Sequence, residues 1–110
     1  MFAFEIPGMR YSLTAGAAIE RHRFVSVDAN SNGITATTAT KVVGVSMNKV
    51  AANEVLEVAD GIVMVEAGGA VTPGAGVGSN ASGQAVAAEA SVGVALTGAS
   101  AAGELITIKL

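Results

Sequence analysis

Few side chains in this sequence could carry out chemistry, and their spacing does not bring the necessary partners together. His22 is the only histidine, and it stands between Arg21 and Arg23. A catalytic histidine needs an orienting carboxylate and a nucleophile, but no Ser/His/Asp order or Gly-x-Ser-x-Gly elbow is present. The sequence contains no cysteine, which removes thiolate chemistry, disulfides and Cys-based metal sites. We therefore predict that the protein is not an enzyme.

The acidic and glycine-rich motifs also have simple structural interpretations. Glu54, Glu57 and Asp60 are close in sequence, but within a strand Glu57 would face away from the other two. One histidine and scattered acids do not make a metal-binding cluster. Residues 74–78 (Gly-Ala-Gly-Val-Gly) lack the following helix of a dinucleotide-binding loop and the Gly-Lys-Ser/Thr of a P-loop. We expect no metal, cofactor or small-molecule substrate.

The composition indicates a single small domain that associates with a partner. The 110 residues are too few for two independent cores. Hydrophobic residues make up 51% but aromatic ones only 4%, so each buried side chain removes little apolar area from water. Charged residues amount to 14%, against about 25% in typical soluble domains. A thin core and a weakly charged surface favour oligomerisation or docking onto another protein.

The net charge of −3 and the N-terminal sequence exclude several other classes. Arg10, Arg21 and Arg23 are the only gathered basic residues, too few to neutralise nucleic-acid phosphates. Residues 1–7 lack the basic start of a signal peptide, and no apolar run reaches the about 18 residues of a membrane span. We expect a soluble protein that binds neither nucleic acid nor membranes and is synthesised in the cytoplasm.

An internal repeat is the strongest organising signal. Four motifs recur in the same order, and each second member follows the first by 49 to 52 residues. The pairs are 15–19 with 67–71, 30–33 with 80–83, 43–47 with 92–96, and 54–58 with 104–108. We interpret residues 11–60 and 63–110 as two copies of one unit of about fifty residues. The alternative is coincidence, because a composition biased toward Ala and Gly inflates self-similarity.

Within each copy, apolar residues alternate with a period of two, which predicts short β-strands. Strands are expected at 24–28, 55–58, 61–66 and 105–110, with turns at 30–33, 51–53 and 72–74. Only residues 14–20 resemble a helical turn, and Gly16 weakens that prediction. The predicted fold is all-β, a small barrel or sandwich built from two pseudo-symmetric repeats related by a pseudo-twofold.

Residues 1–11 fall outside the repeat and form a predicted extended arm before a single β domain at 12–110. Pro7 and Gly8 should interrupt regular structure within the arm. The large apolar side chains of the arm are the candidate docking site: Phe2, Phe4, Ile6, Met9 and Tyr11. Alternation places the first three on one strand face, which can add to the sheet edge of a partner or a neighbouring copy. The alternative is that the arm folds back and completes its own core; we favour docking.

The order of the motifs also carries a family resemblance. Residues 13–19, 23–28 and 42–45, followed by 65–71, 92–96 and 101–106, resemble tailed-bacteriophage capsid decoration (cement) proteins. The resemblance covers nearly the whole chain from Leu13 onward. It implies a structural virion protein on the outer surface of an icosahedral capsid. Such a protein binds the major capsid protein and clamps neighbouring subunits, often as a trimer, which would stabilise the assembled lattice by mass action.

Two other functions remain open. Lipoyl and biotinyl carrier domains also have two similar halves, and they present a modified lysine at a hairpin tip. Lys49, within residues 47–50 (Met-Asn-Lys-Val), stands at a predicted turn, but the acidic flank of such sites is missing and Gly98 occupies the equivalent position. The other alternative is a different virion component, such as a tail or fibre module.

Overall fold

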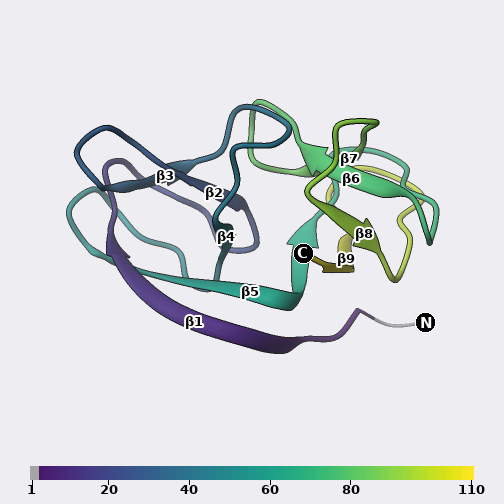
Figure 1. Ribbon diagram of the computed structural model, residues 1–110, viewed down its shortest axis with the longest axis horizontal. Helices are drawn as coiled ribbons and strands as arrows, with labels where there is room; N and C mark the ends of the chain where they lie inside the picture. Colours follow the sequence, from purple (N-terminus) through teal and green to yellow (C-terminus); the bar gives the residue numbers. More distant parts are fainter. Residues whose placement is uncertain (1–2) are drawn as a thin grey trace.

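The computed structural model describes residues 3–110, and in them it has nine β-strands and no helix (Figure 1). The strands are β1 (Ile6–Thr14), β2 (Phe24–Val27), β3 (Gly33–Thr35), β4 (Gly44–Ser46), β5 (Val55–Glu66), β6 (Gly76–Ser79), β7 (Ala85–Ala87), β8 (Gly93–Ala95) and β9 (Leu105–Lys109). The all-β prediction is therefore confirmed. The helical turn predicted at 14–20 is wrong, because Ala15 and Ile19 form bridges to Gly33 and Val50 instead. The described residues include no helix able to cross a membrane.

One curled antiparallel sheet contains all the strands, with β5 at its centre. The order is β3-β2-β4-β5-β9-β8-β6-β7, and β1 pairs along β5. The first part of β5 pairs with β1 and β4, and its last five residues pair with β9. Figure 1 shows the β5 ribbon turning sharply before its arrowhead. Gly61, with a φ of +94°, stands at the change of partner.

The pairings on the two sides of Gly61 correspond strand by strand. In the first half (residues 10–59), β1 pairs with β5, β5 with β4, β4 with β2, and β2 with β3. In the second half (residues 62–109), the end of β5 pairs with β9, β9 with β8, β8 with β6, and β6 with β7. Thr14 faces Val55 in the first half, and Glu66 faces Leu105 in the second, at offsets of 52 (14 to 66) and 50 (55 to 105).

Backbone conformation repeats in the same way. The three non-glycine residues with positive φ among those described are His22, Ser31 and Asn53. Glycines with positive φ stand at the equivalent positions of the second half, 74, 83 and 103. Each position ends a turn that needs a left-handed residue, and glycine accepts that conformation without a Cβ clash. The repeated turns therefore have the same backbone shape although their side chains differ.

The sequence match at the first turn is two residues out of register. Residues 30–33 and 80–83 were expected to correspond, but the side chain of Asp28 matches that of Asn80. Oδ1 of Asp28 accepts hydrogen bonds from the backbone nitrogens of Asn30 and Asn32. Oδ1 of Asn80 accepts the same pair of bonds two and four residues further on. The capping side chain sets where each turn lies. The Asn and Gly residues that the two segments share therefore do not mark equivalent positions.

Each half encloses its own apolar cluster. In the first half it comprises Ala15, Ile19, Val25, Val50, Leu56 and Val58, with Tyr11 and Leu13 packed against them. The second-half counterparts, in the same order, are Ala67, Val71, Val77, Ala99, Ile106, Ile108, Val63 and Val65, all buried. That second cluster continues into Phe24, Ala36, Val45 and Ala59 of the first half. Small aliphatic side chains thus fill both halves, and Phe24 lies at the junction between them.

The predicted arm does not end at residue 11 as a separate segment, because β1 runs from Ile6 through Thr14 without a break. The interruption predicted at Pro7 and Gly8 takes the form of a β-bulge between Pro7 and Met9, after which pairing with β5 resumes. The backbones of Gly8 and Gly61 pass close to each other there, and a Cβ on Gly61 would lie 2.5 Å from the Gly8 nitrogen.

Replacement of Gly61 by alanine should destabilise the protein strongly, because it combines an unfavourable φ with a backbone clash. Gly103→Ala is the matched control, since Gly103 has a φ of +93° and open space around its Cβ position. We expect Gly103→Ala to cost about 1–2 kcal/mol of unfolding free energy and Gly61→Ala clearly more. Urea denaturation followed by circular dichroism measures both, and equal losses would contradict the close crossing.

Candidate interaction surfaces

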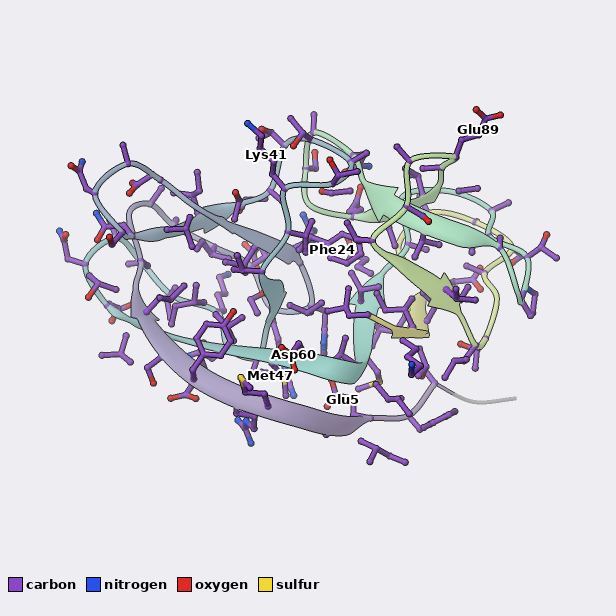
Figure 2. All side chains as sticks on the ribbon, in the orientation of Figure 1. Glu5, Phe24, Lys41, Met47, Asp60 and Glu89 are labelled. Carbon is purple, nitrogen blue, oxygen red and sulfur yellow. The ribbon has the colours of Figure 1, made fainter. Side chains whose placement is uncertain are left out.

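Arg23, just before β2, and Phe24, the first residue of β2, both contact the second half at the junction between the halves. The backbone nitrogen of Phe24 donates to the carbonyl oxygen of Gly83 at 2.7 Å. The Arg23 guanidinium donates to the carbonyl oxygen of Ser82 at 3.0 Å and forms a 2.8 Å ion pair with Glu66. Figure 2 shows Phe24 at the centre of the molecule, between its two sides. One arginine and one fully buried aromatic ring therefore take part in the contact between the halves, together with backbone hydrogen bonds such as that from Glu66 to the carbonyl oxygen of His22.

His22 lies beside this junction and combines a left-handed backbone conformation with a buried ring nitrogen. Its φ is 61°, and its Nδ1 is buried without a hydrogen-bond partner among the described residues. Burial lowers the pKa of His22 below 6.5, and the neighbouring charge of Arg21 lowers it further. Glu5, Glu66 and the backbone of Met64 act in the opposite direction without cancelling the shift. The lowered pKa favours the neutral form of the His22 imidazole.

The lowered pKa of His22 predicts a loss of stability in mild acid. The unfolded chain takes up a proton at His22 below pH 6.5, before the folded protein does, so the unfolding free energy falls as the pH is lowered through this range. His22→Asn should flatten the profile between about pH 7 and pH 5, because asparagine tolerates a positive φ and carries no titrating group. Thermal unfolding across this range tests it, and identical profiles for both proteins would exclude His22 as the cause.

The contacts across the junction are not reciprocal. The second-half equivalents of Arg23 and Phe24 are Ala75 and Gly76, and neither has a hydrogen bond to the first-half turn among the described residues. Gly83 is buried by the junction, whereas its first-half equivalent, Ser31, is exposed. A twofold axis would make both contacts the same. The pseudo-twofold that the sequence analysis predicted is therefore not confirmed, because this contact is made in one direction only.

Of the five predicted docking residues, four lie among the described residues, and these four differ in exposure. Phe2 lies outside the described residues. Phe4 is half-buried, and its backbone nitrogen and oxygen both bond to the Thr107 hydroxyl, at 2.5 and 2.7 Å. Tyr11 is half-buried, and its hydroxyl donates to the carbonyl oxygen of Val43 at 2.7 Å. Only Ile6 and Met9, which are 63% and 59% exposed, are available to a partner.

Sequence reasoning missed the residues that receive the N-terminal segment. Thr107 is fully buried in β9, and the carboxylate of Glu5 accepts a 3.2 Å hydrogen bond from the backbone nitrogen of Met64. These bonds satisfy polar groups that a sheet edge would otherwise leave open. No spacing signal could have found them, because Phe4 and Thr107 are 103 residues apart.

Sequence reasoning also missed a hollow apolar surface. A depression of about 460 Å³ is lined by Ser91, Val92, Gly93, Val94, Leu96, Lys109 and Leu110, and we call these residues the open face. A second hollow, of about 350 Å³ and lined partly by Asp60 and Gly61, shares Val92 and Leu110 with it. Val94 is 46% and Leu96 38% exposed. The sequence repeat gave one indication of this surface, since Val94 corresponds to Val45, which is fully buried in the other half.

The residues set aside as catalytic candidates have structural roles. The Glu54 carboxylate accepts a hydrogen bond from the backbone nitrogen of Ala51, which caps its own turn, and Glu57 accepts one from the hydroxyl of Ser12. Lys49 is exposed after β4 and lies 3.6 Å from the carboxylate of Glu20. Within residues 3–110, no three His, Cys, Asp or Glu side chains lie close enough to hold a metal ion.

An all-β fold with repeated small turns, exposed apolar strips and an N-terminal strand tied into the sheet defines a structural binding module. The chain belongs to the phage cement protein family, whose model matches residues 5–110. No curated protein matches the sequence. Among solved structures, the chain is similar to the head fiber gp8.5 N base of bacteriophage phi29, with a TM-score of 0.77 and 18% identity over 91% of each chain. The protein is thus a virion structural protein, and at this identity the second likeness concerns the fold alone.

Proposed function

We propose that the protein binds the outer surface of an icosahedral phage capsid and stabilises it by clamping neighbouring subunits of the major capsid protein. The family match over residues 5–110 carries this proposal. A protein that binds the assembled lattice, and not its free subunits, lowers the free energy of the lattice by mass action. The proposed working form is a homotrimer with no catalytic activity, cofactor or modified lysine.

The exposed part of β1 is the proposed capsid contact. Ile6 and Met9 project from a strand that is paired with β5 from Ile6 to Thr14, so they are presented on rigid backbone. Burying two such side chains contributes about 1.5–3 kcal/mol each before ordering costs. Because the strand is already paired within the chain, those ordering costs are small compared with those of a free arm.

Capsids purified without this protein provide the test. Adding the wild-type chain should give co-sedimentation and a higher capsid melting temperature. Ile6→Glu and Met9→Glu should each weaken binding at least tenfold, because a carboxylate would be buried unpaired at the contact. Val55→Glu is the control: Val55 is 62% exposed, much like Ile6, but lies at the far end of the β1 pairing. Failure of the wild type to bind would refute capsid binding, while equal binding by all variants would refute only the β1 contact.

A second candidate is the base of a head fibre, favoured by the likeness in fold to the phi29 structure. A cryo-EM map of the virion distinguishes the two, because a fibre base would carry further density away from the shell. We also propose that the two halves are copies of one unit joined head to tail, within a single domain at 12–110. The repeated pairings and the matching positive-φ positions support this duplication.

A further inference from the structure

The open face of the second half is the counterpart of a surface that the first half buries. The first-half residues packed into the junction are Phe24, Ala36, Val42, Val45, Met47 and Ala59. By the strand pairings, their second-half equivalents are Gly76, Ala88, Ser91, Val94, Leu96 and Lys109. Four of the latter line or adjoin the hollow of the open face, and none is fully buried. The same surface is therefore largely buried in the first half and more exposed in the second.

The turn between β6 and β7 covers the part of this surface at Phe24 and Ala36. Its Gly83 carbonyl accepts the Phe24 nitrogen, and the Cβ position of Gly83 lies 2.7 Å from Cγ2 of Thr35. Ser79, just before this turn, donates through its hydroxyl to the carbonyl oxygen of Ala36 at 3.3 Å. In this contact, one tight turn packs against an apolar strand surface.

The first half has the equivalent turn, and its outer residues, 29–31, are exposed. Residues 27–32, which we call the β2–β3 turn, correspond to 79–84. Val27 is 40% exposed where Ser79 is buried, and Ser31 is exposed where Gly83 is buried. The turn carries one charged residue, Asp28, and the open face carries one, Lys109. The two exposed surfaces are thus the repeat equivalents of surfaces that pack together within the chain, and they carry opposite charges.

We propose that the β2–β3 turn of one copy packs at Gly76 and Ala88 of the next, beside its open face, repeating between chains the contact made within each chain. This inference rests on the self-association proposed above but not on capsid binding. A head-to-tail contact gives each copy one donor and one acceptor surface, so copies close into a ring or continue as a filament. In the proposed trimer, three chains would close a ring in which every junction has the same form.

Cysteine cross-linking tests the contact directly, because the wild-type chain has no cysteine. The inter-chain equivalents of Gly83 and Thr35 are Ser31 and Ala87, both exposed and small. Their Cβ atoms should approach within disulfide range, about 3.5–4.5 Å. Under mild oxidation, the double variant Ser31→Cys/Ala87→Cys should form covalent trimers, and a mixture of the two single variants should form mixed dimers. Each single variant alone should remain monomeric on a non-reducing gel.

Two outcomes would overturn the proposal. Disulfide dimers of a single variant would show a reciprocal contact, and a double variant that stays monomeric would show that the two surfaces do not meet. Val94→Glu gives a second readout without cysteines, since it places a carboxylate in the open face. It should abolish the wild-type oligomer in sedimentation velocity, while Val55→Glu, on another exposed strand position, should leave it intact. A Val94→Glu protein that assembles like the wild type would also refute the contact, whatever its capsid binding.

Discussion

The whole sheet depends on β5 being one strand with two sets of partners. Its first part pairs with β1 and β4 in the first half, and its last part pairs with β9 in the second half. The change of partner requires a backbone conformation that side chains disfavour and a passage close to Gly8, so Gly61 is required by both φ and space. With only 4% aromatic residues, each half has a core of small side chains, and the shared strand joins the two sets of pairings in one sheet.

The junction shows how a thin core is supplemented. Phe24 is the largest fully buried side chain among the described residues, and it lies where the second cluster extends into the first half. Its ring occupies space that neither set of small aliphatic residues fills. The partly shielded Arg23–Glu66 ion pair adds little energy by itself, but its hydrogen bonds fix the orientation of one half against the other. Packing therefore supplies the stability and the polar contacts supply the register.

Much of the fold could be predicted from the sequence, because period-two alternation and turn residues report local structure directly. The segments 43–47 with 92–96 and 54–58 with 104–108 occupy equivalent places in the pairings, because their apolar spacing reflects the sheet. The sequence alignment of the first turn was out by two residues, since Asp28 and Asn80 differ in residue type but have the same capping role. The way in which the two halves pack together was out of reach, because a repeat in sequence specifies what the units are and not how they meet. The pairing of Phe4 with Thr107 depends likewise on closure of the whole chain.

The continuity of β5 determines how a load would pass through the molecule. If the two halves are attached to different capsid subunits, relative movement of those subunits pulls one half against the other. The junction at Phe24 and Arg23 would have to separate before the halves could part, but the peptide backbone at Gly61 would still connect them. The tether between the two attachment points is thus covalent. Rupture of the clamp would then begin at the capsid contacts or by unzipping of a half, and the link itself would be its strongest part.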